Sequence, residues 1–322
     1  DAPERGALGG IAAVLAEAGV APAELTLLVH GTTLATNAII ERKGARTALV
    51  TTAGFRDSLE MAYENRFEQY DMYIEKPAPL VARRLRFTVP ERMNAGGQPL
   101  VPLDEAAVRA LAGPLRQAGI EAVAVGFLHS YANDAHERQA AAILAEELPD
   151  LRITLSSEVC PEIREYERLS TAVANAYVQP LMASYLVKLE RALGEMGVAC
   201  PMFLMTSGGG LTTFETAARF PIRLVESGPA GGAILAASIA GELGLSSILS
   251  FDMGGTTAKI CLIDDAAPQK SRFFEVDRRY RFVKGSGLPV RIPVIEMVEI
   301  GAGGGSIATV DVTRRIAVGP DS

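Results

Sequence analysis

Residues 248–263 carry the clearest structural signal of the chain and read Ile-Leu-Ser-Phe-Asp-Met-Gly-Gly-Thr-Thr-Ala-Lys-Ile-Cys-Leu-Ile. Two apolar runs of strand length flank an acidic residue, a glycine pair and two threonines, which predicts a β-hairpin. Glycine lets the backbone turn tightly and approach a ligand without a Cβ in the way. Because such a turn points several N–H groups into one concavity, it favours phosphate. The candidate phosphate contacts are Gly254, Gly255, Thr256 and Thr257.

Asp252 precedes the glycine pair, at the end of the first predicted strand. A hydrated Mg²⁺ ion prefers one or two carboxylates together with phosphate oxygens. Asp252 is therefore the candidate to hold Mg²⁺ through water. The alternative is an ordinary glycine-rich hairpin in which Asp252 only caps the turn, and the spacing alone does not choose between the two.

Upstream of the hairpin, the sequence predicts a strand at residues 223–225, a Glu-Ser-Gly-Pro turn at residues 226–229, and a small-residue helix at residues 233–241. Ser227 suits the N-cap and Pro229 suits a first helical turn. This order resembles the actin–Hsp70–sugar-kinase ATPase superfamily. The resemblance implies that the helix connects two lobes and that the hairpin is the second phosphate-binding loop.

The same resemblance implies roles for three residues of the turn and the helix. Glu226 would be a second carboxylate that binds the metal shell or orients water, and Gly228 and Gly231 would approach the phosphates. As a bare sequence feature, Glu226 is more often an acidic residue near a helix cap. A helix rich in alanine and glycine is also typical of close packing on a sheet.

The composition limits the function classes. The chain has 322 residues, 48% of them hydrophobic and only 6% aromatic, and a net charge of −7. This length favours two domains, predicted at residues 1–160 and 161–322. The negative charge argues against nucleic acid, and no apolar run approaches the ~18 residues of a membrane span. Three cysteines without metal-binding spacing predict core residues of a cytoplasmic protein.

The first half of the sequence predicts an α/β domain with a mostly parallel, doubly covered sheet. Strand 24–29, helix 34–43 and strand 46–51 form a β-α-β unit, which implies parallel pairing of its strands. Further expected elements are strands 84–89, 122–128 and 151–159, a helix capped by Asp104, and a helix over residues 133–148.

The second half predicts a long helix over residues 161–195, interrupted at Pro180, that bridges the lobes. Next come strand 202–206, a tight turn at 207–210 and a short helix near 213–218. Strands are also expected at 272–283 and 290–298, before a second glycine cluster at 301–306. The two glycine-rich turns either border a cleft or are simply tight turns; their candidate residues are Ser207, Gly208, Gly209, Gly303, Gly304 and Ser306.

His30 lies at a strand-to-helix junction with Thr32, Thr33 and Asn37. Free N–H groups at such a junction favour an anion or a carbonyl group. These four residues are the candidates for the substrate side of the site, and the alternative is a structural cap at the strand end. The other two histidines are predicted on a strand end and a helix start, and without a third ligand we expect no zinc site.

Nine ordered segments together resemble the hydantoinase A / 5-oxoprolinase family. They begin with His-Gly-Thr-Thr-Leu-Ala-Thr-Asn-Ala, and they span residues 30–38, 41–46, 54–57, 128–133, 162–168, 175–180, 227–231, 251–256 and 301–308. The resemblance implies a two-lobed ATPase fold of the actin/Hsp70/sugar-kinase type. It also implies ATP-dependent opening of a cyclic amide, such as a hydantoin or 5-oxoproline, through phosphorylation of its carbonyl group. The cofactors would be ATP and Mg²⁺, and the partner would be a B-type subunit in an oligomer.

Two departures from the family pattern matter. The chain starts after the position of the first phosphate hairpin and stops before an expected adenosine-contacting segment, so we expect a fragment. Lys259 stands where many relatives have an acidic residue; we interpret it as a surface strand residue, with contact to phosphate as the alternative. The motifs do not separate the amidohydrolase from a ketone carboxylase subunit. A nucleotide-gated conformational module without catalysis is the hypothesis from another class.

Overall fold

The computed structural model describes residues 3–64, 66–255, 257–280 and 283–318 of this mixed α/β protein. Strands β10 (Ser247–Met253) and β11 (Ala258–Asp264) pair antiparallel, as the sequence predicted. The predicted phosphate contact Thr256 lies outside the described residues. A third strand, β17 (Val298–Ile300), pairs with the other edge of β11. The hairpin is thus part of a larger sheet.

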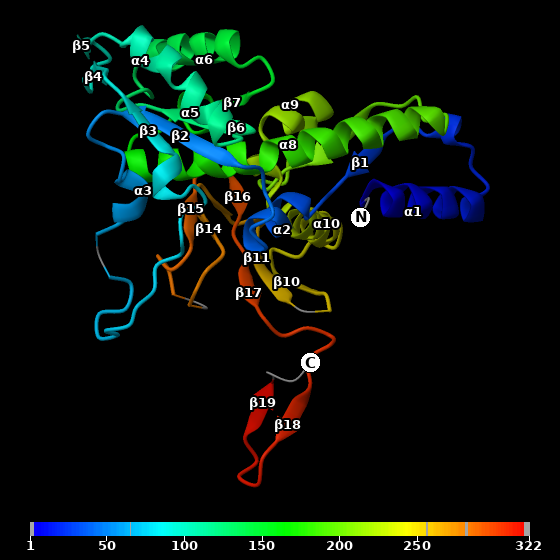
Figure 1. Cartoon of the computed structure of the whole chain (residues 1–322). Coiled ribbons are helices and arrows are strands. Elements are labelled where there is room, and N and C mark those ends of the chain that lie inside the picture. The colour runs from blue at the N-terminus through cyan, green and yellow to red at the C-terminus, as the bar shows by residue number, and fades with distance from the viewer. Residues whose placement is uncertain (1–2, 65, 256, 281–282, 319–322) are drawn as a thin grey trace.

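A four-stranded parallel sheet forms the N-terminal body, which confirms the predicted sheet (Figure 1). Its spatial order is β3 (Arg86–Val89), β2 (Thr47–Thr52), β6 (Ala122–Gly126) and β7 (Arg152–Leu155). Every residue of β2 and β6 is buried. Strands buried on both faces read as continuous apolar runs, which is why residues 122–126 lack an alternating pattern.

Alternate residues of the central strands point to opposite faces of this sheet. Val50 and Val125 pack against helices α4 (Glu105–Ala110), α5 (Ala112–Gln117) and α6 (Ala135–Glu147). Leu49 and Ala124 pack against α8 and the short α3. Their bounds are Glu165–Glu195 and Ser58–Met61. The sheet is therefore the middle of three layers (Figure 1).

Helix α8 runs without interruption through Pro180, so the predicted break is wrong. Proline lacks an N–H and normally disrupts a helix interior. The bond lost at Pro180 is the one to Ala176 O, and the neighbouring carbonyl oxygen of Tyr177 is held from outside the helix by Ala45 N at 2.8 Å. The close approach requires Gly44, since a Cβ there would lie 2.2 Å from the Tyr177 ring. Burial on nearly all sides from residue 167 to residue 179 holds the helix together.

The strand before helix α2 (Leu34–Ile40) belongs to a different sheet from the strand after it. Strand β1 (Leu28–His30) pairs in parallel with β8 (Met202–Met205), which in turn pairs with β9 (Leu211–Thr213). The predicted parallel pairing of residues 24–29 with 46–51 is therefore wrong. A β-α-β sequence pattern does not exclude a crossover between sheets, and α8 separates the two sheets here.

The connector region begins with 3₁₀ helix η3 (Pro221–Leu224), so the strand predicted at residues 223–225 is wrong. Pro221 favours a helical first turn, and Ile222 and Leu224 are buried in the cluster that α8 contributes to. Helix α10 (Ser227–Glu242) follows, and its alanines pack on β11 through Cys261 and Ile263. This packing agrees with the expected small-residue helix on a sheet.

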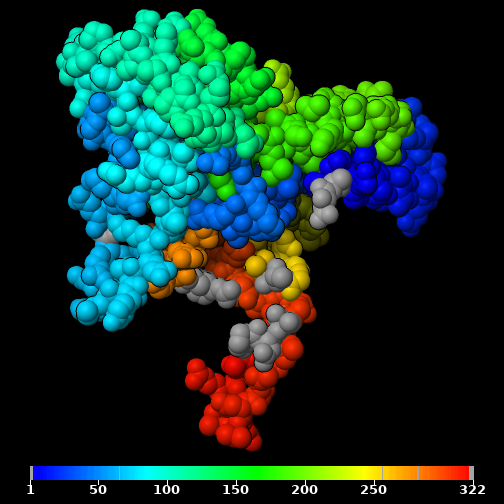
Figure 2. Space-filling model, viewed as in Figure 1, coloured from blue at the N-terminus to red at the C-terminus, as the bar shows by residue number. Residues whose placement is uncertain are grey.

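The remaining elements complete the C-terminal half and the chain ends. Short antiparallel pairs join β13 to β16 and β14 to β15. The pair of β18 and β19 projects away from the body (Figures 1 and 2). The bounds are β13 (Lys270–Ser271), β14 (Phe274–Val276), β15 (Leu288–Val290), β16 (Val294–Ile295), β18 (Ala308–Val310) and β19 (Ile316–Val318). Helices α1 (Pro3–Ala18), α7 (Ser156–Val159) and α9 (Phe214–Arg219), 3₁₀ helices η1 (Pro22–Glu24) and η2 (Arg83–Leu85), and strands β4 (Arg92–Met93), β5 (Pro99–Val101) and β12 (Ala267–Pro268) make up the rest.

Two composition-based expectations can be compared with this fold. All three cysteines are free, and Cys160 and Cys261 are buried, as expected of core residues. Within the described residues, no helix is both long enough and hydrophobic enough to cross a bilayer.

Candidate functional site

Three charged side chains form a row across the sheet that contains the hairpin. Asp252 on β10 pairs with Lys259 on β11, which pairs with Glu299 on β17. Directly paired residues project from the same face of a sheet, about 4.5–5.5 Å apart at Cβ. The row therefore alternates acid, base and acid beside the glycine turn.

Lys259 reaches from this row to the start of helix α10. Its Nζ donates a hydrogen bond to the Glu226 carboxylate and lies 3.8 Å from Glu299 Oε1. The Lys259 and Glu226 side chains are only 15% and 12% exposed. The interpretation of Lys259 as a surface strand residue is therefore wrong. A hollow of the molecule is lined by this pair together with Glu299 and apolar residues of β14 and β16.

Glu226 holds an unusual backbone conformation. Its φ of 61° lies in the left-handed region, which costs free energy for a residue with a Cβ and persists only where surrounding contacts enforce it. One such contact is the hydrogen bond from Glu226 N to Thr36 Oγ1 at 3.3 Å. Residue 226, and not Ser227, occupies the N-cap position, so the predicted cap is wrong.

Ser227 instead joins the helix start to the predicted substrate segment. Its hydroxyl donates to Thr32 O at 3.1 Å, and its Oγ accepts from Thr32 N at 3.4 Å. The backbones touch as well, because a Cβ on Gly31 would lie 3.8 Å from Gly228 Cα. The first N–H groups of a helix lack partners within it and favour an anion. The 30–37 segment and the connector helix thus meet at one place.

The second glycine cluster packs on the hairpin turn. Gly304 N and Gly305 N donate to the carbonyl oxygens of Gly254 and Gly255, both at 2.9 Å. A Cβ on Gly305 would approach Gly255 O to 3.1 Å, so the contact requires a residue without a side chain. Ser306 closes this second turn by accepting from Gly303 N at 3.0 Å. The contact joins two loops that lie about fifty residues apart in the sequence.

Asp252 is exposed beside these loops, so its carboxylate faces solvent. Among the described residues, no group of three histidine, cysteine or acidic side chains is arranged to hold a metal ion directly. A cation at Asp252 would therefore keep several water ligands, as Mg²⁺ usually does. His129 and His136 have other partners, Tyr131 and the buried Glu91 carboxylate.

His30 lies on the opposite side of the same junction. Its Nε2 is 2.8 Å from Tyr185 OH on helix α8, and burial lowers its pKa. The ring is therefore mainly neutral at pH 7. Thr33 and Asn37 are linked by a side-chain hydrogen bond of 3.5 Å. The histidine is anchored on α8, while Thr32 contacts α10.

The turn at Ser207–Gly209 packs inside the molecule. Ser207 is 1% exposed, and both its N and its Oγ donate to Arg223 O. Gly209 has a φ of +79°, and a Cβ there would lie 2.8 Å from the Ile234 side chain. Gly231 likewise lies next to the Met205 side chain. These contacts fit a tight turn on which α10 rests.

The structure thus brings most of the sequence candidates together around the start of α10. Residues 31–36 touch residues 226–228, Glu226 touches Lys259, and the two glycine loops touch each other. Sequence reasoning missed the ion pair of Lys259 and the participation of Glu299. The available signal was a single charge inside each of two otherwise apolar strands, residues 258–263 and 298–300.

Comparison with known proteins matches both halves of the chain to one family. The hydantoinase/oxoprolinase N-terminal region matches residues 1–148, and the hydantoinase/oxoprolinase domain matches residues 168–322. The Uncharacterized protein MJ0964 of Methanocaldococcus jannaschii is 39% identical over 305 residues, which is 93% of this chain and 45% of that protein.

Two solved structures share the fold over nearly the whole chain. The ATP-dependent caprolactamase of Pseudomonas jessenii superposes with a TM-score of 0.82 at 34% identity, over 98% of this chain and 45% of that one. A nucleotide-free acetone carboxylase superposes with a TM-score of 0.76 at 29% identity, over 96% of this chain and 44% of that one. The chain therefore spans under half the length of these relatives.

Proposed function

The chain belongs to the hydantoinase/oxoprolinase family, and we propose that it contributes the nucleotide-binding part of an ATP-dependent enzyme that opens a cyclic amide. The substrate class would be a hydantoin, 5-oxoproline or a related lactam. The similarity to ATP-dependent caprolactamase supports an amide substrate. The chain would act as the A-type component beside a B-type subunit, because the similar caprolactamase chain of Pseudomonas jessenii is a subunit alpha.

One structural observation carries the proposal. The start of α10 and the hairpin turn bring backbone N–H groups and one exposed carboxylate to the same end of the sheet, and the second glycine turn supports the hairpin through Gly304 N and Gly305 N. Backbone N–H groups at a helix start and in glycine turns suit phosphate oxygens. The exposed Asp252 carboxylate suits a hydrated cation. The residues present therefore fit a metal-bound nucleotide.

We assign the groups as follows. Gly255 and Thr257 would hold the phosphates, Gly254 would shape the turn by donating to Thr257 O at 2.9 Å, and Asp252 would hold Mg²⁺ through water. When bound, ATP would supply the phosphoryl group that activates the amide carbonyl. Lys259 neutralises Glu226, which reduces the repulsion between this buried carboxylate and a polyphosphate.

The substrate would lie beside residues 30–37. Thr32 and Thr36 already bridge this segment to the start of α10, so a carbonyl group there would be close to the bound phosphates. Fixed donors that hold a reacting carbonyl in place lower the barrier by removing the entropy cost of alignment. His30 is neutral near pH 7 because burial lowers its pKa, and it would donate a hydrogen bond without adding a charge.

A ketone carboxylase subunit is the second candidate, supported by the TM-score of 0.76 to acetone carboxylase. Both candidates use the same phosphate and metal groups, and they differ in the acceptor that the activated site receives. A nucleotide-gated module without catalysis is the third candidate. It would use the α10 junction but would not need the 30–37 segment.

Substrate-stimulated ATP hydrolysis separates the three candidates. The protein, alone and with its B-type subunit, would be assayed for phosphate release with hydantoin, 5-oxoproline or caprolactam, with acetone plus bicarbonate, or with unfolded peptide. We expect a cyclic amide to stimulate release and EDTA to abolish it. Stimulation by ketone plus bicarbonate would select the carboxylase, and stimulation by peptide would select the module. Phosphate release that no cyclic amide raises would contradict the proposal.

A further inference from the structure

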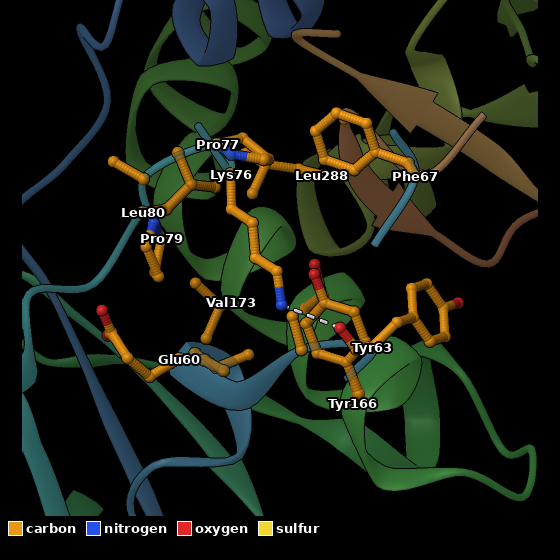
Figure 3. A pocket seen from close by; sticks show the side chains of 16 residues that line it. Glu60, Tyr63, Phe67, Lys76, Pro77, Pro79, Leu80, Tyr166, Val173 and Leu288 are labelled. Carbon is orange, nitrogen blue, oxygen red and sulfur yellow. Dashed lines mark hydrogen bonds between the residues drawn. The ribbon is translucent and has the colours of Figure 1, made fainter. Parts of the chain in front are cut away.

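A second hollow lies against the first turns of helix α8, away from the charged row. It has a volume of about 200 Å³ and is bounded by residues 59–63, Phe67, residues 76–80, helix α8 and residues 285–288 (Figure 3). It shares no residue with the candidate nucleotide site. The segment that includes residues 76–80 stands out from the body below α3 (Figures 1 and 2).

The walls of this pocket are mainly apolar and come from well-packed elements. Tyr166, Ser170 and Val173 line it from one face of α8, as expected for side chains separated by four and three residues. Phe67 and Leu288 line other sides (Figure 3). Ligand pockets characteristically combine such walls with a few convergent polar groups.

Lys76 provides the single cationic side chain among the lining residues. Its Nζ donates to Tyr63 O at 2.8 Å (Figure 3) and to Met61 O at 3.3 Å. An ammonium group has three donors, so one N–H is left for a ligand. The acidic lining residue Glu60 is already neutralised, because Arg86 Nη2 donates to its carboxylate at 2.7 Å. The pocket therefore presents a net positive charge.

Tyr166 and Ser170 add two hydroxyl groups. No hydrogen bond joins either hydroxyl to the described residues, whereas the Tyr63 hydroxyl donates to Glu167 Oε1 at 2.9 Å. Burial and the neighbouring Glu167 raise the pKa of Tyr166 to about 12, so its hydroxyl keeps its proton at neutral pH. Three donors and an apolar body thus line one pocket.

We propose that this pocket binds a small monocarboxylate with an aromatic or branched aliphatic body. The carboxylate would accept hydrogen bonds from Lys76 and from a hydroxyl, while the body would contact Phe67, Val173 and Leu288. Charge-assisted hydrogen bonds are the stronger kind, and the apolar walls exclude a free inorganic anion by leaving most of the pocket unable to solvate it. The site goes beyond the proposed nucleotide chemistry and does not depend on it.

The test uses three probes of one shape with different charges: 4-methylbenzoate, 4-methylbenzamide and 4-methylbenzylamine. Binding to the 322-residue chain would be measured by calorimetry, with saturation-transfer NMR to identify the ligand groups in contact. We expect 4-methylbenzoate to bind most tightly. Lys76→Met should weaken 4-methylbenzoate about tenfold or more, the loss expected for one charge-assisted hydrogen bond, and should leave the amide unaffected.

A mouth-blocking variant and a matched control locate the site. Ala78 is exposed and lines the pocket, so Ala78→Trp should abolish binding without unfolding the chain. Val187→Trp places the same side chain on an exposed position of α8 outside the pocket and should leave binding unchanged. Unchanged 4-methylbenzoate binding in Ala78→Trp would overturn the location. Tighter binding of the amine than of the benzoate, or no binding of the benzoate, would overturn the proposed ligand class.

Discussion

The parallel sheet β3-β2-β6-β7 and the antiparallel sheet β10-β11-β17 differ most in how far their strands are buried. Every residue of β2 and β6 is buried between two helical layers. Strand β10 instead has five exposed positions out of seven, including Phe251 and Asp252. Helix α10 covers only one face of this second sheet, through the cluster around Cys261 and Ile263.

The difference separates two tasks of one chain. The parallel-sheet body holds polar groups such as the Glu137 carboxylate inside, hydrogen-bonded to their neighbours, so that changes there act on folding. The antiparallel sheet exposes the charged groups of Asp252 and Glu299, so that changes there act on ligands. Local stability varies across a protein, and binding loops come from its less buried parts. The predictions below test whether the effects divide in this way.

The largest effect is expected at Glu137, which is completely buried in the parallel-sheet body. Its carboxylate accepts from Phe127 N, Ser157 N and the hydroxyls of Ser156 and Ser157, at 2.6–3.0 Å. Glu137→Ala leaves these donors without a partner and should lower the free energy of unfolding by about 3–5 kcal/mol. Urea denaturation measures the loss.

Glu195→Ala is the matched control, because this carboxylate on α8 is 69% exposed. A substitution there should change the free energy of unfolding by less than about 0.5 kcal/mol. A similar loss in both variants would mean that burial does not distinguish the two regions.

The parallel sheet was also the part most predictable from sequence. Residues 122–126 are an apolar run, and residues 47–52 combine three apolar residues with three β-branched threonines, so the local pattern identifies both strands. The partner of strand β1 was not predictable, because its pairing with β8 joins segments about 170 residues apart. Composition contains no information on which of two sheets a strand enters.

The candidate site likewise has one part that the sequence predicts and one part that it does not. The hairpin of Asp252 followed from its glycine pair, since φ/ψ freedom is a local property. The ion pair of Lys259 with Glu226 did not follow from the sequence, because it depends on the direction in which α10 starts after the left-handed residue Glu226. Strained backbone at residue 226 is set by tertiary contacts such as that with Thr36.

The second largest effect is expected in the antiparallel sheet, on catalysis. Asp252→Asn removes the exposed charge assigned to the cation and should lower ATP turnover about 100-fold or more, a loss typical of one electrostatic partner. Stability should stay within about 0.5 kcal/mol, because the side chain is exposed. Phosphate release and urea denaturation would be measured on the same preparation.

Asp264→Asn is the internal control for that variant. Asp264 is an exposed acid at the other end of the same hairpin, so it carries the same change in charge. If its replacement reduced turnover as much as Asp252→Asn, net charge and not cation binding would explain the result.

A smaller effect is expected at the partly buried ion pair of Lys259 and Glu226, where a substitution affects both packing and ligand binding. Lys259→Met leaves the Glu226 carboxylate without its cation and should cost about 1–2 kcal/mol. Adding Glu226→Gln should recover most of this loss, because the unpaired charge is then gone. Thermal midpoints of the two single variants and the double variant give the coupling. Strict additivity would show that the pair does not interact in solution.

The smallest effect is a pH dependence at His30. Burial lowers the pKa of this residue in the folded chain, so below its unfolded pKa of about 6.5 the unfolded chain binds more protons than the folded one. Stability must therefore fall as the pH drops from 7 toward the folded pKa. His30→Gln removes the titration and should flatten this part of the curve of thermal midpoint against pH. His129→Asn is the control, since asparagine tolerates the left-handed backbone at that position.

The same His30 variant also tests the substrate assignment: a flattened curve with unchanged substrate-stimulated ATP hydrolysis would make His30 a purely structural residue held by Tyr185. Lost stimulation with preserved basal hydrolysis would instead place the histidine with the exposed, ligand-facing part of the molecule despite its burial.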